Sequence, residues 1–105
     1  MIVQLNTDAN IQGTEALKAQ VDSVVRGALE PLSRHITRVE VHLSDTNSDA
    51  KDGPADIRCL LEARPAGRDP VVASHHAATV AEAVDGAAGK LKRALESVFG
   101  RLGQF

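Results

Sequence analysis

The stretch TVAEAVDGAAGKLKRALESVFGRL, residues 79–102, predicts one long amphipathic helix whose apolar side the rest of the chain must cover. Thr79 and Glu82 have the Ser/Thr-x-x-Glu spacing of a capping box, which marks a helix start. Aliphatic residues then recur at steps of three and four, which keeps them on one face of a helix. This apolar face comprises Val80, Val84, Ala87, Leu91, Leu95, Val98 and Leu102.

The charged residues of this helix form two flanks, one on each side of the apolar face. At 3.6 residues per turn, Lys90, Arg93 and Arg101 line one side, which we call the cationic flank. The opposite flank carries both signs, from Asp85, Lys92 and Glu96. A cationic flank is most often a solvated helix edge, where basic residues suit the helix dipole. The alternative is phosphate binding, because Lys and Arg on a rigid helix position a nucleic-acid backbone without reading its bases.

Length and composition favour one compact domain, residues 1–105, with an aliphatic core. Hydrophobic residues make up 43% of the chain but aromatic residues only 2%, which argues against modules that stack bases on aromatic side chains. The net charge of −2 means that any RNA contact depends on a local patch. Cys59, the single cysteine, excludes an intramolecular disulfide. Without a membrane span or a signal peptide, we expect a cytoplasmic protein with no membrane partner.

The remaining segments alternate between short strands and one further helix. Strands are predicted over residues 2–6, 36–43, 56–64 and 71–75, with a polar loop over 44–55. A helix begins after Thr14, its N-cap, and ends near Pro31. Its outward face carries Lys18, Asp22, Arg26 and Glu30, an alternation of sign that is typical of a salt-bridged surface.

This order, β-α-β-β-β-α, predicts an α+β fold. A right-handed crossover makes the first two strands parallel, and the short later connections make their strands antiparallel. A four-stranded mixed sheet results, with both helices packed on one face. The other face stays open, and Arg38, Arg58 and Arg64 point to it, interrupted by Glu40 and Glu62.

No arrangement in the sequence indicates an enzyme, a metal site or a cofactor. His75 and His76 are adjacent on a strand, so their side chains point to opposite faces and do not share a ligand. Residues 45–56 resemble a calcium loop but have Ala50 where the sharp turn needs glycine. Cys59 alternates with aliphatic residues, which indicates a core position.

Residues 83–95, AVDGAAGKLKRAL, resemble the last-helix motif of the short ribosome hibernation-promoting factors, which belong to the sigma-54 modulation protein family. The family pattern is roughly A-I-D, four residues, then K-L-x-R-Q-L. Residues 2–17 and 38–41 are also similar to the family. The resemblance implies a single hibernation-factor domain with a fold like that of double-stranded-RNA-binding domains, which agrees with the order of elements derived from the residues.

The resemblance also implies a function. Such a protein is a ribosome-associated translation inhibitor of the stress response or stationary phase. It binds 16S rRNA in the decoding channel of the small subunit and blocks mRNA and tRNA, with no DNA or small-molecule partner. The RNA-binding residues that we predict are Lys90, Arg93, Arg101, Arg26, Arg38, Arg58 and Arg64. The alternative is a diverged family member that regulates another protein through the open sheet face.

Overall fold

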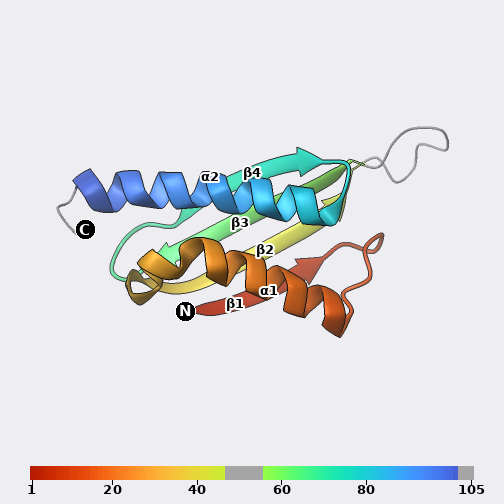
Figure 1. Cartoon of the computed structure of the whole chain (residues 1–105), viewed down its shortest axis with the longest axis horizontal. Coiled ribbons are helices and arrows are strands. Elements are labelled where there is room, and N and C mark those ends of the chain that lie inside the picture. The colour runs from red at the N-terminus through yellow and green to blue at the C-terminus, as the bar shows by residue number, and fades with distance from the viewer. Residues whose placement is uncertain (47–55, 102–105) are drawn as a thin grey trace.

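The computed structural model describes residues 1–46 and 56–101, except for the side chain of Arg101 (Figure 1). Residues 47–55, which make up most of the predicted loop 44–55 and of the calcium-like segment 45–56, lie outside the described residues, as does Leu102. The elements are β1 (Ile2–Thr7), α1 (Glu15–Leu29), the 3-10 helix η1 (Glu30–His35), β2 (Ile36–Asp45), β3 (Ile57–Pro65), β4 (Val71–Ala77) and α2 (Val80–Arg101). No described helix is long and apolar enough to span a membrane.

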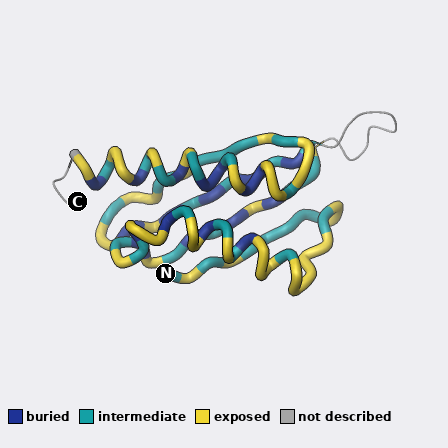
Figure 2. The backbone as a smooth tube through the Cα atoms, viewed as in Figure 1, coloured by how far each residue is buried: buried dark blue, intermediate teal, exposed yellow. Residues whose placement is uncertain are grey.

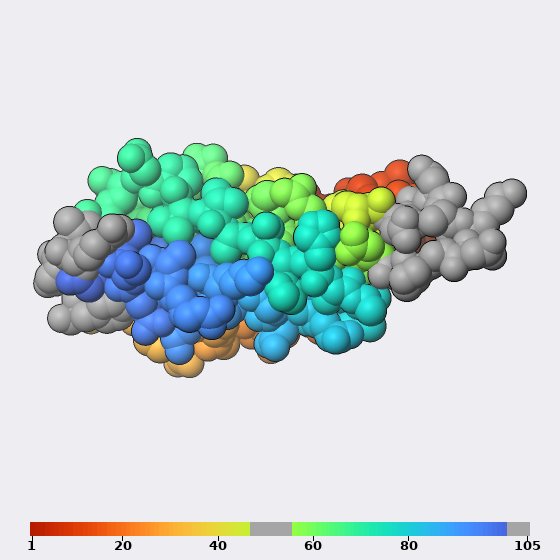
Figure 3. Space-filling model, turned by 90° about the horizontal axis from the view of Figure 1, so that it is seen from above, coloured from red at the N-terminus to blue at the C-terminus, as the bar shows by residue number. Residues whose placement is uncertain are grey.

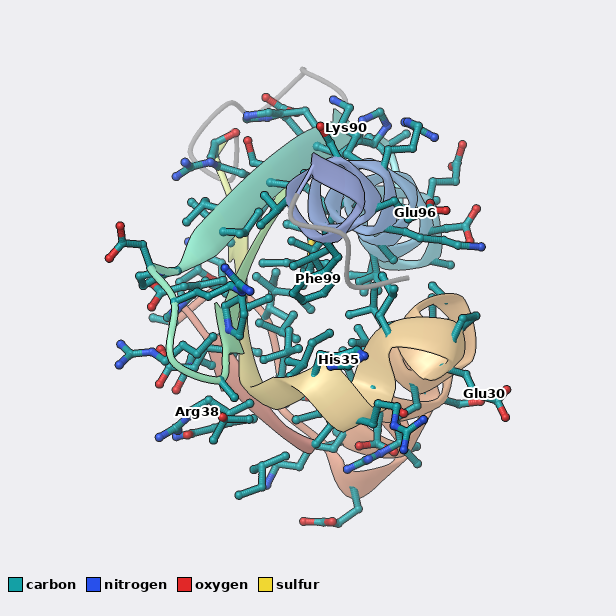
Figure 4. The ribbon with its side chains drawn as sticks, turned by 90° about the vertical axis from the view of Figure 1, so that its left-hand side faces the viewer. Glu30, His35, Arg38, Lys90, Glu96 and Phe99 are labelled. Carbon is teal, nitrogen blue, oxygen red and sulfur yellow. The ribbon has the colours of Figure 1, made fainter. Side chains whose placement is uncertain are left out.

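The four strands form one mixed sheet in the order β1-β2-β3-β4. Strand β1 runs parallel to β2, and the other two pairs are antiparallel, as the connections predicted. Both helices cover the same face of the sheet (Figure 4), so the predicted α+β architecture is confirmed. The face opposite the helices is called the open face below.

Strand β2 is longer than the sequence predicted. Ser44 and Asp45, expected in the loop, continue the antiparallel ladder opposite Arg58 and Ile57. Their short polar side chains favour turns, but pairing with a neighbouring strand outweighs this local preference. Strand β4 likewise extends to Ala77, opposite Ile57.

Both predicted helix starts are confirmed. The Thr14 hydroxyl accepts a hydrogen bond from the Leu17 amide at 3.1 Å and caps α1. The Thr79 hydroxyl accepts from the Glu82 amide at 3.2 Å and donates to the Glu82 carboxylate at 2.9 Å. These local bonds satisfy amides that have no partner inside the helix.

The core lies between the sheet and the two helices, as the buried segments in Figure 2 show. Its residues are aliphatic except for Phe99 and Cys59, and the described part of the chain buries no polar or charged residue. Burial raises the pKa of the Cys59 thiol to about 12. The chain therefore forms a dry core with few aromatic rings, as its composition indicated.

Phe99 is a core residue that the predicted apolar face omitted. Its side chain is 1% exposed, and its ring lies 5.4 Å from the ring of His35 at an angle of 51°. Figure 4 shows Phe99 pointing from α2 toward the interior and toward His35 of η1. The buried face of α2 is wider than the predicted one because α1 packs against it as well as the sheet, and the His35 ring contacts Phe99.

Candidate nucleic-acid interface

The cationic flank of α2 lies beside the edge strand β4. Lys90 and Arg93 are exposed on this flank, and Lys90 Nζ donates to the Ser74 carbonyl oxygen at 3.1 Å. In Figure 4, Lys90 lies on the β4 side of α2 and Glu96 on the opposite side, as the helical spacing predicted. Arg93 forms no ion pair with any described residue. Arg101 ends the helix, and its side chain is outside the described part.

A glycine allows α2 to lie this close to β4. A Cβ atom at Gly86 would lie 2.2 Å from His75 Cδ2 and 2.6 Å from Cγ, so only hydrogen fits against the imidazole. His76 points the other way, and its Nδ1 is 3.0 Å from an Asp56 carboxylate oxygen. The two imidazoles therefore lie on opposite sides of the sheet, as predicted. In Figure 3 the surfaces of α2 and β4 adjoin along one side of the molecule.

The open face carries arginines whose charge is partly compensated. Arg38 and Arg64 lie opposite each other on β2 and β3, and Glu40 lies opposite Glu62 in the adjacent row. Arg38 forms an ion pair with Glu40 at 3.2 Å, and Arg64 with Glu62 at 3.0 Å. Each pair joins residues two apart on one strand, so the two like-charged rows neutralise each other. These two arginines therefore offer less free charge than the sequence suggested.

Arg58 differs from the other arginines of the open face, because it forms no ion pair within the described residues. It contributes to a depression of about 360 Å³ at the end of the sheet near residue 46. The lining residues are Asn6, Thr7, Asp8, His42, Leu43, Ser44, Arg58 and Leu60. Among the described residues, Arg58 is thus the arginine of this face that has no ion-pair partner.

Hydrogen bonds join neighbouring strands at the end of the sheet beside Arg58. The Asp56 carboxylate accepts from the Thr46 hydroxyl at 2.9 Å and lies 3.0 Å from His76 Nδ1. The Thr46 hydrogen bond, followed by His76, lowers the pKa of Asp56 below its ordinary value of 3.8. The Thr46 amide also donates to the Asp56 carbonyl at 2.9 Å. These contacts join β2, β3 and β4 where residues 47–55 begin and end.

Arg26 lies on α1, away from the other predicted residues. Its guanidinium forms an ion pair with Asp22 at 2.9 Å and donates to the Met1 carbonyl at 2.8 Å. Lys18 similarly pairs with Glu15 at 3.4 Å, so this helix surface is salt-bridged as its alternating signs predicted. Arg26 therefore anchors the start of β1 while it remains exposed.

The family model for sigma 54 modulation protein / S30EA ribosomal protein matches residues 5–102. The chain belongs to this family. The match includes both helices, all but the first three residues of β1 and the remaining strands. The resemblance of residues 83–95 to the family's last helix pointed to the same family.

Two solved structures share the fold of this S30EA family member. A ribosomal subunit interface protein from Coxiella burnetii superposes with a TM-score of 0.78 at 13% identity, covering 95% of this chain and 99% of that one. The N-terminal domain of Protein Y from Thermus thermophilus gives 0.74 at 16% identity, covering 93% and 99%. Comparison with curated protein sequences gives no match.

Apart from Arg101, whose side chain is not described, the predicted residues of this S30EA protein occupy three places: the α2 flank, the open face and the β1 side of α1. No local sequence pattern pointed to Arg68, which lies in the turn between β3 and β4. Together with Val98 of α2, this turn lines a groove of about 690 Å³. Arg68 lies near Val98 only in the folded chain, because strand β4 and most of α2 separate these two residues in the sequence. The described residues hold no cluster of His, Cys, Asp or Glu that could bind a metal ion.

Proposed function

We propose that this protein binds the small ribosomal subunit and inhibits translation under stress or in stationary phase. Its site would be the decoding channel, against 16S rRNA, where it would block mRNA and tRNA. The observation that carries the proposal is membership of the S30EA family over residues 5–102. The similar structures support it, because one is described as a ribosomal subunit interface protein. Such a function is non-enzymatic and cytoplasmic, and one domain spanning residues 1–105 would perform it.

The cationic flank is the surface of this chain that suits an RNA backbone best. Arg93 is exposed without an ion pair in the described residues, and Lys90 retains donors beyond its bond to Ser74. Phosphate oxygens accept such charge-assisted hydrogen bonds, and a rigid helix fixes their positions. We include Arg101 on this flank by helical spacing. Arg68, across the adjoining groove, is a further candidate.

The other predicted residues can be ranked by whether their positive charge already has an ion-pair partner among the described residues. Arg58 comes next, because no described ion pair compensates it. Arg38, Arg64 and Arg26 rank last, because each already pairs with a carboxylate. Breaking an exposed ion pair costs at most about 1 kcal/mol, so these residues can still exchange partners on binding RNA.

Co-sedimentation with ribosomes tests the proposal. The chain should pellet with small subunits at low salt and dissociate as salt rises, because phosphate contacts release counterions. Absence from the ribosome pellet at low salt would overturn the proposed function. A translation assay should show inhibition over the same range of salt concentrations.

Two adjacent residues of α2 provide a matched pair of variants. Arg93→Glu reverses a charge on the cationic flank, and Lys92→Glu makes the same kind of change on the opposite flank. We expect Arg93→Glu to weaken ribosome binding at least about tenfold, since it replaces a phosphate contact by a repulsion. Lys92→Glu should bind much as the parent does. Equal effects of the two variants would remove the flank from the interface.

A second candidate function is protein binding through the open face. The compensated pairs Arg38–Glu40 and Arg64–Glu62 and the 52% exposed Val72 favour a mixed polar partner surface over RNA. A pull-down dominated by one non-ribosomal protein, insensitive to salt, would support this alternative. Loss of that protein with Val72→Glu would locate the contact.

A further inference from the structure

The sheet has two edge strands, β4 and β1. At the β4 edge, Lys90 reaches over from α2 and donates to the Ser74 carbonyl at 3.1 Å. At the β1 edge, the strand sequence IVQLNT contains no charged residue and no proline, the features that usually prevent a sheet edge from pairing. Ile2 on this strand is 61% exposed. Arg26 covers the Met1 carbonyl at the start of this edge, and the uncharged strand from Val3 to Thr7 is available for pairing.

The direction of the backbone groups of β1 follows from one hydrogen bond. The Asp8 amide donates to the Leu43 carbonyl at 3.1 Å and continues the parallel ladder with β2. Backbone groups of successive residues in a strand point to alternate sides, so even-numbered residues bond to β2 and odd-numbered residues face outward. The Met1 carbonyl agrees, because it accepts from Arg26 on the outer side. The outward residues of the strand are Val3, Leu5 and Thr7.

A groove adjoins this edge on the helix side. It has a volume of about 300 Å³ and lies between β1 and α1. Its lining residues are Val3, Leu5, Glu15, Lys18, Ala19, Val21 and Asp22. Val3 and Leu5 are only partly buried there. A strand added to β1 would place alternate side chains over this groove while its backbone bonded to the edge.

We propose that two copies of this chain associate through β1, in an antiparallel pair about a two-fold axis. With Leu5 on the axis, Val3 lies opposite the partner's Thr7, and every outward amide and carbonyl of the three residues finds a partner. The two sheets then form one continuous sheet with the helices on the same face.

A second copy fits this edge better than a charged segment would. It supplies aliphatic side chains to the aliphatic part of the groove, and it brings no charge along β1. The rim of the groove has a positive and a negative side chain, Lys18 and Glu15, whose charged groups lie 3.4 Å apart. A two-fold axis can therefore place the positive side chain of one copy near the negative side chain of the other. The surface is separate from the cationic flank, so the inference does not depend on ribosome binding.

The contact is one strand and the flank of one helix, which places it among small interfaces that bury less than about 1,200 Å². We therefore expect a dimer that dissociates on dilution. Sedimentation equilibrium over a concentration series, with the full chain and no ribosomes, tests for it. A monomer throughout the series, up to about millimolar protein, would overturn the proposal.

Amide hydrogen exchange by NMR identifies the contact independently of any variant. Where about nine-tenths of the chain is dimeric, exchange at Val3, Leu5 and Thr7 should slow about tenfold relative to dilute protein, because only the monomer exposes these amides. Gln4 and Asn6 are internal controls, since their amides bond to β2 in both states. A dimer in which the three outward amides still exchange as in dilute protein would contradict the β1 pairing.

Two lysine substitutions provide a matched test. Val3→Lys places a charge at the β1 edge, and Val72→Lys makes the same change on β4, where the native side chain is 52% exposed. We expect loss of the dimer in Val3→Lys and an unchanged dimer in Val72→Lys, with circular dichroism confirming that each folds. A dimer that survives in folded Val3→Lys, or that Val72→Lys abolishes, would place the interface elsewhere. If Val3→Lys does not fold, the exchange measurement decides the question.

Discussion

Replacing Gly86 by alanine tests the close contact that places the cationic flank beside β4. The added methyl group would lie 2.2 Å from His75 Cδ2 and 2.6 Å from Cγ. Because Cγ is the ring atom attached to Cβ, turning the ring about its own bond does not clear the methyl group. Overpacking of this kind costs about 1–3 kcal/mol. Alanine returns about 1 kcal/mol through its better helix propensity, so we expect a net loss of about 2 kcal/mol at most.

Gly89, one turn further along the same helix, is the matched control. A Cβ atom there meets only Arg93 Nη1, at an ordinary 3.7 Å. Gly89→Ala should therefore stabilise the fold by about 1 kcal/mol, the usual gain of alanine over glycine in a helix interior. The two alanine variants should then differ in their free energies of unfolding by about 1–3 kcal/mol, set by the contact with His75.

Urea unfolding followed by far-ultraviolet circular dichroism measures both variants, since the chain has no Trp or Tyr for fluorescence. The double variant Gly86→Ala with His75→Ala should recover part of the loss, because the smaller side chain removes the overlap. If Gly86→Ala proves as stable as Gly89→Ala, the close approach of α2 to β4 is refuted. An unchanged loss in the double variant would show that the clash involves another group.

Three further predictions concern the core and the end of the sheet. Phe99→Ala should lower the free energy of unfolding by about 3–5 kcal/mol because it empties a buried site, and a loss below about 1 kcal/mol in urea unfolding would contradict its burial. The Cys59 thiol, with its pKa raised to about 12, should react with a disulfide reagent at about pH 8 only after unfolding, and rapid reaction of the folded protein would count against this. The lowered pKa of Asp56 means that its carboxylate stabilises the fold above its ordinary value of 3.8 and loses this effect as the pH falls below it. The stability difference between the parent and Asp56→Asn should thus shrink between about pH 7 and pH 2, and a constant difference would disprove the linkage.

The candidate site was predictable from sequence only in part. The spacing of Lys90 and Arg93 placed both on one flank of α2, and the alternation of β2 and β3 sent Arg38, Arg58 and Arg64 to the open face. The strand register then determined which of them meet carboxylates. An arginine two residues from a glutamate on the same strand can pair with it or with a neighbour across the sheet, and the sequence does not select between them.

Arg68 and Phe99 show the same limit. The β3–β4 turn approaches α2 only because the antiparallel pair brings it back beneath the helix, so a local pattern contains no sign of Arg68 in a groove. Phe99 follows Leu95 by four residues, so helical spacing allows it on the apolar face, but its burial needs α1 packed beside α2 and the His35 ring against its own. Each depends on a neighbour distant in sequence.

The sequence by itself determined the order of elements, the starts of both helices and the face that each element turns to the core. Those features follow from periodicity and capping, which act within one turn or between adjacent residues. The tertiary structure decided the distance of α2 from β4, the partners of the arginines and which strands form the two sheet edges. These depend on how separate elements pack, as at Gly86, where the absence of one methyl group sets the position of the helix that carries Lys90 and Arg93.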